Sequence, residues 1–358
     1  MGNVLIDPLS SGAGAVVEYL AEHVITCLIP AFFIAGAIVA FVKKDAILKY
    51  FGPTVKKRSS YAIAAVSGAV LAVCSCTILP LFAGIYKKGS GIGPATAFLY
   101  AGPAINILAI VYTAQVLGYG LGAARAVAAV TMSIVIGLSM ATIFKEHDRT
   151  NASNKVRNKK SKVSRKGVGR PTWVTLAFFG LMVAILVIGA SKLAWTPKLA
   201  IVYIMTLFVS YILIYHYSRD EVTEWGFETW DLTKKIFPIL IGGTFIVGVM
   251  AYYLPPETFR SYLGDNSLQA TFLASIIGAI LYMPTLLEVP IIGTTFGYSD
   301  GIMAGGPALS LLLAGPAVSL PNIVVLYRIM GPKKTGVYIL LVIIVSTIVG
   351  FVYGNTMT

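Results

Sequence analysis

Two cysteines separated by a single residue, Cys74 and Cys76 around Ser75, are the side chains best suited to chemistry in this chain. On a continuous helix, residues i and i+2 point about 200° apart, so the two thiols converge on one ligand only at a helix break. Pro80 follows closely and favours such a break. Thiolates bind soft metals and metalloids, while a close thiol pair can instead do redox work. A third interpretation is that these small side chains only pack between helices.

The tetrapeptide Ala-Gly-Pro-Ala occurs twice, at 101–104 and 314–317. Because proline lacks an N–H and clashes with the preceding turn, Pro103 and Pro316 predict helix breaks. Inside a bilayer, broken backbone survives only where protein or a water-lined cavity satisfies it. A helix that begins there directs partial positive charge toward a polar or anionic group. The repeated motif therefore predicts a solute cavity, against the alternative of plain kinks that allow close helix packing.

One carboxylate, Glu288, lies within a hydrophobic segment. An ionisable group inside a membrane is costly and by default indicates a solute pathway or a proton relay. The alternative is a structural pair with Arg125 or a lysine. A 210-residue offset places Glu288 opposite Ile78, two residues past Cys76, so we expect the thiols and the carboxylate to meet near the membrane midplane.

Cys74, Cys76 and Glu288 thus head the predicted site, in which Glu288 carries the coupling proton. The residues expected to bind solute are Cys74, Ser75, Cys76, Thr77, Pro80, Gly102, Pro103, Asn106, Gly315, Pro316, Ser319 and Asn322. No catalytic residue, cofactor or resident metal is expected, apart from a soft metalloid at the two cysteines. The three histidines, at 23, 147 and 216, lack zinc-ligand spacing, and the chain lacks nucleotide-binding glycine motifs.

The elements that must position these residues follow from composition. Of 358 residues, 57% are hydrophobic and only 12% are charged, with a mean hydropathy of +0.81. Soluble domains are about 25% charged, so the chain is expected to be an all-α polytopic membrane protein. Its net charge of +13 gathers in short stretches, which does not suit nucleic-acid binding. Three cysteines are too few for a secreted disulfide scaffold, and residues 1–23 lack the basic region of a signal peptide.

Ten hydrophobic segments are long enough to cross or enter a bilayer. They are 23–42, 61–86, 93–117, 121–144, 173–190, 199–216, 236–254, 268–296, 303–327 and 335–354. We divide the chain into a first transmembrane repeat (1–144), a basic linker (145–172), a connecting transmembrane pair with an amphipathic segment (173–235) and a second transmembrane repeat (236–358). The amphipathic segment, 219–235, is expected to form a short interfacial helix or a solvated loop.

The two repeats are visible as matched motifs. GPATAFLYAGPAIN at 93–106 aligns with GPALSLLLAGPAVS at 306–319, at an offset of 213 residues. Gly68 and Pro80 match Gly278 and Pro290 at an offset of 210. Internal repeats of this kind are a recurring construction of secondary transporters.

Basic residues predict how the repeats are oriented, because lysine and arginine favour the cytoplasmic side. Loop 43–58 has six basic residues and one acid, and 145–170 has ten and two, so both are expected in the cytoplasm. Three hydrophobic segments lie between these loops, so one of them, 61–86, must enter and leave by the same face. Its counterpart 268–296 is interrupted by prolines and flanked by loops poor in basic residues. We expect an inverted repeat of about eight spans and two re-entrant hairpins, with both termini outside. The alternative is ten simple spans, with one basic loop that violates the charge rule.

The run Cys74-Ser75-Cys76, Pro80, Lys87-Lys88-Gly89 and AFLYAGPAIN resembles a predicted-permease family that includes the organoarsenical efflux permease ArsP and YraQ-like proteins. The second copy's Glu-Val-Pro and LLAGPAVSLPN fit the same family, and the resemblance covers nearly the whole chain. It implies a multi-pass permease of a prokaryotic inner membrane, with trivalent organoarsenicals or related thiophilic compounds as cargo. Thr77 stands where many relatives have glycine.

These observations favour a secondary permease over an enzyme. It would move a small solute, such as an effluxed thiophilic metalloid or organoarsenical, through a midplane site between the repeats, with proton coupling. The alternatives are an intramembrane thiol oxidoreductase using Cys74 and Cys76, a permease for another sulfur- or metal-related solute, and a scaffold subunit. The expected partners are a small-molecule substrate and the lipid bilayer, with no nucleic acid and with a homo-oligomer left open.

Overall fold

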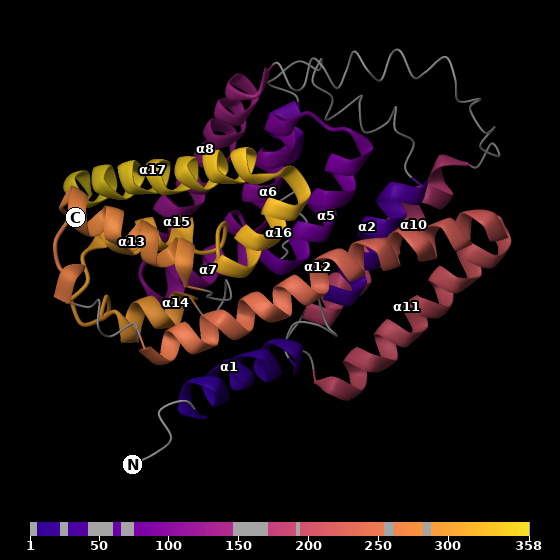
Figure 1. Ribbon diagram of the computed structural model, residues 1–358, viewed down its shortest axis with the longest axis horizontal. Helices are drawn as coiled ribbons and strands as arrows, with labels where there is room; N and C mark the ends of the chain where they lie inside the picture. Colours follow the sequence, from indigo (N-terminus) through magenta and orange to yellow (C-terminus); the bar gives the residue numbers. More distant parts are fainter. Residues whose placement is uncertain are drawn as a thin grey trace.

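The computed structural model describes residues 6–21, 28–41, 60–65, 75–145, 171–190, 194–253, 261–281 and 288–357. These residues are almost entirely helical (Figure 1). The elements are α1 (Ile6–Tyr19), α2 (Ile29–Phe41), α5 (Ser75–Lys88), α6 (Ile92–Ala104), α7 (Ile107–Val116), α8 (Tyr119–Ile143), α10 (Thr172–Ala190), α11 (Trp195–His216), α12 (Arg219–Tyr253), α13 (Leu268–Ile280), α14 (Glu288–Pro290), the π-helix η3 (Ile291–Thr295), α15 (Gly305–Ala314), α16 (Leu320–Met330) and α17 (Pro332–Thr356).

Several of these helices are apolar enough to cross a membrane. Among the described residues, three do so by length and composition alone, at Tyr119–Ile143, Thr196–His216 and Pro332–Thr356. Helices α6 and α7, taken together as one bent span, are also long and apolar enough to cross a membrane. Five shorter helices are apolar as well. The chain is therefore a polytopic membrane protein, as its composition predicts. The expected eight spans and the inverted orientation stay predictions.

Helix α12 differs from the sequence-based expectation. Residues 219–235 do form a helix, but it is not a separate short one, because it continues through Pro238 to Tyr253. Its first turns place Trp225 in the interior, where the indole Nε1 donates to the Phe33 carbonyl at 2.8 Å. The expected boundary at 235/236 thus falls inside one helix. A proline removes a single backbone donor, and the surrounding turns can sustain the helix across that loss.

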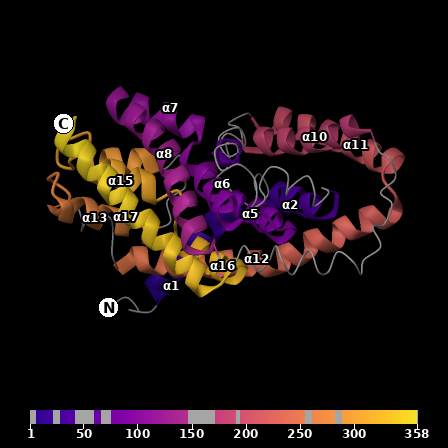
Figure 2. The same cartoon turned by 90° about the horizontal axis from the view of Figure 1, so that it is seen from above.

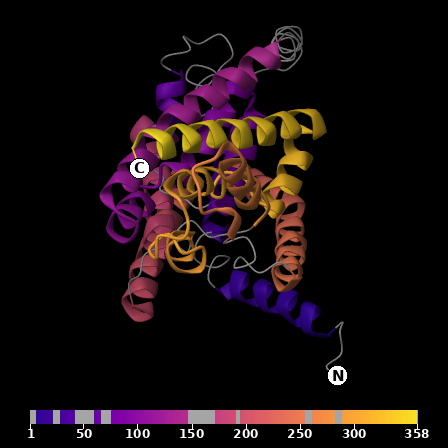
Figure 3. The ribbon, with the colours of Figure 1, turned by 90° about the vertical axis from the view of Figure 1, so that its left-hand side faces the viewer.

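Two further differences concern the first half of the chain. Helix α1 was not expected as a separate element; it lies along α12, on the side of the molecule away from α17 (Figure 3). Its Ser11 Oγ donates to the Gly248 carbonyl at 2.9 Å. The expectation of a break at Pro80 was wrong, because α5 runs through that residue without interruption. The segment 66–74 that precedes α5 lies outside the described residues.

The two repeats pack alike. Helix α6 packs on α8 in the first, as α15 packs on α17 in the second. Both pairs meet at glycines: an added Cβ on Gly93 would lie 2.8 Å from the Gly137 carbonyl oxygen, and one on Gly350 would lie 2.6 Å from the Gly306 oxygen. These glycines are related by the same 213-residue offset as the repeated sequence. The equivalent contacts show that the sequence repeat is also a packing repeat.

The hairpin of α10 and α11 lies at one end of the molecule, away from α13, α15 and α17 (Figures 1 and 2). Helix α10 packs against α2, and rings of Phe41, Phe178, Tyr217 and Trp225 form an aromatic cluster beside this contact. Helix α11 carries many exposed apolar side chains, as expected of a lipid-facing span. The motif-bearing helices therefore occupy the centre and the opposite end.

Candidate functional site

Both Ala-Gly-Pro-Ala segments end a helix, as predicted. The first lies at the end of α6, and the helix that follows is bent from it by 43°. The second ends α15 at Ala314, and α16 begins only at Leu320. All the residues of both segments are buried. The two breaks thus bring non-helical backbone into the interior of the protein.

A buried ion pair lies beside the second break. The Arg125 Nη2 of α8 is 3.2 Å from Oε2 of Glu288, at the start of α14, and neither side chain is exposed. The Arg125 Nη1 donates to Thr113 Oγ1 at 2.8 Å, and Thr113 in turn donates to the Ala109 carbonyl at 2.7 Å. The chain of contacts therefore joins α7, α8 and α14. Removing charges from water is costly, so such a pair is retained only where its hydrogen bonds hold it.

Each partner of this ion pair keeps one atom without a hydrogen bond. Within the described part of the chain, neither Oε1 of Glu288 nor Nε of Arg125 has a partner. An added Cβ on Gly315 would lie 2.5 Å from Glu288 Oε1. The free carboxylate oxygen thus faces the glycine of the second Ala-Gly-Pro-Ala segment, and only a glycine leaves it room. A buried polar atom without a partner costs about 1–3 kcal/mol.

The same contact occurs in the first repeat with an apolar side chain. An added Cβ on Gly102 would lie 2.6 Å from Cδ1 of Ile78. Gly102 and Gly315 are equivalent at the 213-residue offset, and Ile78 and Glu288 at the 210-residue offset. The structure therefore places a carboxylate in one repeat where the other has an isoleucine. The repeats are alike in packing and unlike in chemistry at this point.

The two breaks also lie close to each other. The hydroxyl of Tyr100 in α6 donates to the Leu313 carbonyl of α15 at 3.1 Å. These two residues are equivalents, again 213 apart in sequence. A residue that touches its own equivalent lies where the two copies meet. The ion pair is consequently close to the interface between the repeats.

Several predicted solute-binding residues are buried near these breaks. Ser319 Oγ and Asn322 Oδ1 are buried without a hydrogen-bond partner among the described residues. Asn106 Oδ1 accepts a long hydrogen bond from the Ala109 amide, at 3.4 Å. The remaining described members are all buried: Thr77, Pro80, Gly102, Pro103, Gly315 and Pro316. Buried polar atoms beside broken helices are suited to bind a solute. The burial of the prolines is explained by helix packing.

Cys74 lies outside the described residues, as do the side chains of Ser75 and Cys76. The expected meeting of thiols and carboxylate therefore stays a prediction. Among the described residues, no group of three or more His, Cys, Asp or Glu side chains could hold a metal ion.

The sequence indicated Arg125 only as an alternative partner for Glu288, and no contact of Thr113 or Tyr100 was predicted from it. No periodicity marks Thr113, because a threonine in an apolar helix is common and usually bonds its own backbone. The tyrosine inside the first Ala-Gly-Pro-Ala helix was a usable signal, since a hydroxyl within a hydrophobic segment needs a partner.

The fold and the site together define a polytopic membrane protein with a polar site enclosed between broken, repeated helices, the arrangement of a solute permease. The chain matches the ArsP_1 family model, described as predicted permease, over residues 11–355. It therefore belongs to this predicted-permease family, as the motifs indicate.

Two curated relatives support the assignment. The chain is 43% identical to the UPF0718 protein MJ0584 of Methanocaldococcus jannaschii over 356 residues, covering 95% of this chain and 94% of the relative. It is 23% identical to the UPF0718 protein YraQ of Escherichia coli over 278 residues, covering 78% of this chain and 63% of the relative. No solved structure matches the chain.

Proposed function

We propose that this permease is a secondary transporter whose solute passes between the two repeats, beside the Arg125–Glu288 pair, and whose coupling proton is carried by Glu288. The observation that carries the proposal is a fully buried ion pair, Nη2 to Oε2 at 3.2 Å, next to the break of α15. Ionisable groups inside a membrane are rare and mark substrate and proton pathways. The matching position in the first repeat holds Ile78, so helix packing alone does not require a carboxylate there.

The ion pair provides a two-state element for coupling. When Glu288 is ionised, it holds the Arg125 guanidinium at Oε2. When Glu288 takes up a proton, the attraction is lost, and the guanidinium becomes available to a polar or anionic group of the solute. Ser319 and Asn322, whose buried oxygens have no hydrogen-bond partner in the described part of the chain, would complete the solute's hydrogen bonds. Binding and protonation are thereby linked through a single arginine.

The proposed cargo is a small thiophilic solute, a metalloid or an organoarsenical, with Cys74 and Cys76 as soft ligands. Two features support this. Helix α5 begins at Ser75, within the cysteine motif, and its Ile78 packs on Gly102 at the first break. The second is the cysteine motif itself, which is among the residues that resemble the family. The proposed direction is efflux across a prokaryotic inner membrane, with 145–170 in the cytoplasm.

The topology proposed for this transport is an inverted repeat with two re-entrant hairpins. The equivalent glycine contacts and the Tyr100–Leu313 contact support a twofold relation between the copies, and the basic loops support its inverted sense. Single cysteines at positions 88 and 300, introduced into a variant without native cysteines, test it by labelling from one side of the membrane. Labelling of the two positions from opposite sides is expected, and labelling of both from the same side would refute the inversion.

Transport itself is tested with everted membrane vesicles and a panel of arsenicals, soft metals and sulfur-containing anions. We expect at least one thiophilic solute to accumulate, and a pH gradient to increase that accumulation. Replacing both Cys74 and Cys76 by serine should abolish it. If vesicles move no member of the panel with or without the gradient, the thiophilic cargo is wrong.

A further inference from the structure

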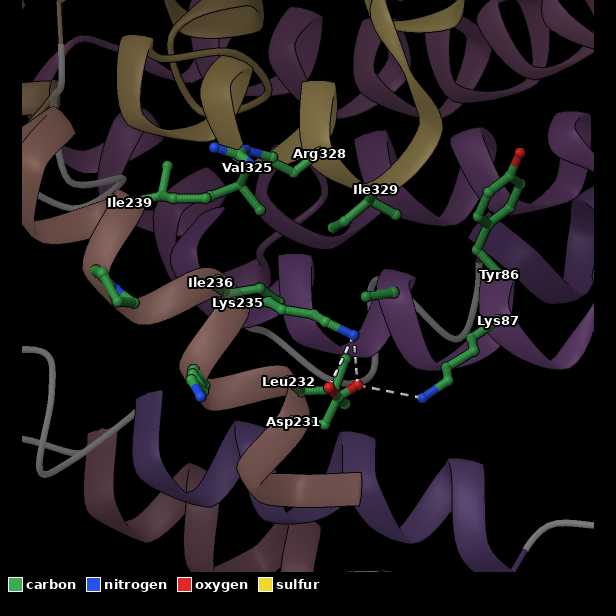
Figure 4. A pocket seen from close by; sticks show the side chains of 13 residues that line it. Tyr86, Lys87, Asp231, Leu232, Lys235, Ile236, Ile239, Val325, Arg328 and Ile329 are labelled. Atoms are coloured by element: carbon green, nitrogen blue, oxygen red, sulfur yellow. Dashed lines mark hydrogen bonds and ion pairs between the residues drawn. The ribbon is translucent and has the colours of Figure 1, made fainter. Parts of the chain in front are cut away.

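A cavity lies outside the ion-pair site, between the C-terminal ends of α5 and α16 and the middle of α12 (Figure 4). Its volume is about 850 Å³, within the range of small-molecule sites. Its lining combines aliphatic side chains of α12 and α16 with the basic side chains of Lys87, Lys234, Lys235 and Arg328. We call it the basic cavity. It plays no part in the proposed coupling at Glu288.

The charges of the basic cavity are only partly balanced. Asp231 contacts Lys235 at 2.8 Å and Lys87 at 3.4 Å, and Lys87 also pairs with Glu228. These contacts leave Lys234 and Arg328, for which no carboxylate in the described part of the chain is a partner. Figure 4 shows Arg328 on α16 across the cavity from Asp231, Lys235 and Lys87. A surplus of two positive charges, on α12 and α16, therefore surrounds the open space.

The walls between these charges are apolar. Ile236 and Ile239 of α12 face Val325 and Ile329 of α16 across the cavity. Arginine and lysine favour oxyanions, arginine by bidentate hydrogen bonds. Aliphatic walls favour a hydrocarbon group of limited size. One ligand that satisfies both is an oxyanion carried on a small apolar group.

The position of the basic cavity relates it to the rest of the chain. Helix α5 runs to it from the cysteine motif, and α16 runs to it from the second helix break. Lys87, Lys88 and Arg328 lie on the side that the basic loops assign to the cytoplasm. Near the rim, Lys334 donates to the hydroxyl of Tyr86 at 2.8 Å, which adds a further positive charge.

From this juxtaposition of unpaired cations and aliphatic walls we infer that the basic cavity is a binding site for an anion with a phosphate-like group attached to a small apolar group. This goes beyond the proposed function, because it assigns a second site, at the C-terminal ends of α5 and α16, away from the cysteine motif and the second helix break. The ligand comes from one of two sources, a free organic anion or the headgroup of an anionic lipid.

The test uses the full-length protein in phosphatidylcholine nanodiscs, with phenyl phosphate as the probe and ionic strength held constant with chloride. Binding is measured by calorimetry for the wild type and for Lys234→Gln and Arg328→Gln. Because a hydrogen bond to a charged group contributes substantially to affinity, each variant should bind about tenfold more weakly. Arg328→Lys keeps the charge and should recover part of the loss. Lys333→Gln is the matched control, an exposed lysine outside the cavity, and should change affinity less than twofold.

A second arm identifies the source of the ligand. Nanodiscs containing phosphatidylglycerol should raise the apparent Kd for phenyl phosphate if a lipid headgroup fills the basic cavity, and this competition should vanish in Arg328→Gln. Unchanged affinity in phosphatidylglycerol indicates a free organic anion. Equal affinities in the wild type, Lys234→Gln and Arg328→Gln, or no binding to any of them, would overturn the inference. Because Lys234 and Arg328 are exposed, their variants should unfold at the wild-type temperature, which is checked without probe.

Discussion

Replacing one partner of the Arg125–Glu288 pair should destabilise the protein more than replacing both. The pair joins α8 to α14, and neither side chain is exposed. Arg125→Met leaves a carboxylate among apolar helices, and Glu288→Leu leaves a guanidinium whose remaining described partner is Thr113. The double variant removes both charges and leaves apolar side chains of similar size. If the two groups interact, the double variant should therefore be more stable than the sum of the two single losses predicts.

The magnitude follows from the distance. Two unit charges 3.2 Å apart attract by about 5 kcal/mol at an effective dielectric constant of about 20. Removing one member of a buried pair costs about 3–5 kcal/mol, whereas replacing the whole pair by apolar groups is often neutral or stabilising. Each single variant should therefore lose about 3–5 kcal/mol of unfolding free energy. The double variant should lie within about 2 kcal/mol of the wild type, a coupling of roughly 4 kcal/mol or more.

Unfolding in mild detergent, followed by tryptophan fluorescence over a urea series, measures these differences. Glu224→Gln is the matched control, since Glu224 is exposed on α12, and it should change stability by less than about 0.5 kcal/mol. If the double variant instead loses as much stability as the two single variants together, Arg125 and Glu288 are not energetically coupled.

The remaining predictions concern the ion-pair site and the basic cavity. Gly315→Ala should displace the Glu288 carboxylate, because its Cβ would lie 2.5 Å from Oε1, and should reduce transport in vesicles; Gly242→Ala, whose Cβ meets nothing within 4 Å, should not. In the basic cavity, the hydrogen bond from Lys235 holds the pKa of Asp231 below 3.8. Burial lowers the pKa of Lys87. The hydrogen bond to Glu228 and the charges of the nearby carboxylates outweigh this effect of burial, so the pKa of Lys87 lies above 10.5. Stability from a lowered carboxyl pKa is present above 3.8 and is lost as the pH falls through the folded value. Titration of the purified protein should therefore show these two groups unchanged in charge from pH 5 to 9.

Part of the geometry of the candidate site could be predicted because its signals are local. A proline inside an apolar segment ends a helix wherever it cannot be accommodated, so both Ala-Gly-Pro-Ala breaks followed from sequence. A single carboxylate in such a segment needs a partner, so Glu288 could be identified from the sequence as a candidate site residue. The matched offsets predicted that Glu288 and Ile78 occupy equivalent positions, and their contacts with Gly315 and Gly102 confirm this.

The features that sequence missed depend on contacts between distant segments. Thr113 has no pattern that distinguishes it from other helical threonines, and its bond to Arg125 exists only once α7 packs on α8. The basic cavity combines residues of three helices, and Lys234 and Arg328 are far apart in the chain. The sequence did not predict that α12 is continuous, because Pro238 and the change from polar to apolar residues both indicate a helix boundary.

If Glu288 carries the coupling proton, its replacement should separate solute exchange from proton-driven accumulation, so the two activities are compared in the same vesicles. Everted vesicles with the wild type, Glu288→Gln or the control Glu224→Gln are loaded with a solute from the transported panel, and the two activities are measured separately. We expect Glu288→Gln still to exchange solute across the membrane but no longer to accumulate it in response to a pH gradient, and Glu224→Gln to do both. Accumulation driven by the gradient in Glu288→Gln at the wild-type rate would show that Glu288 does not carry the coupling proton.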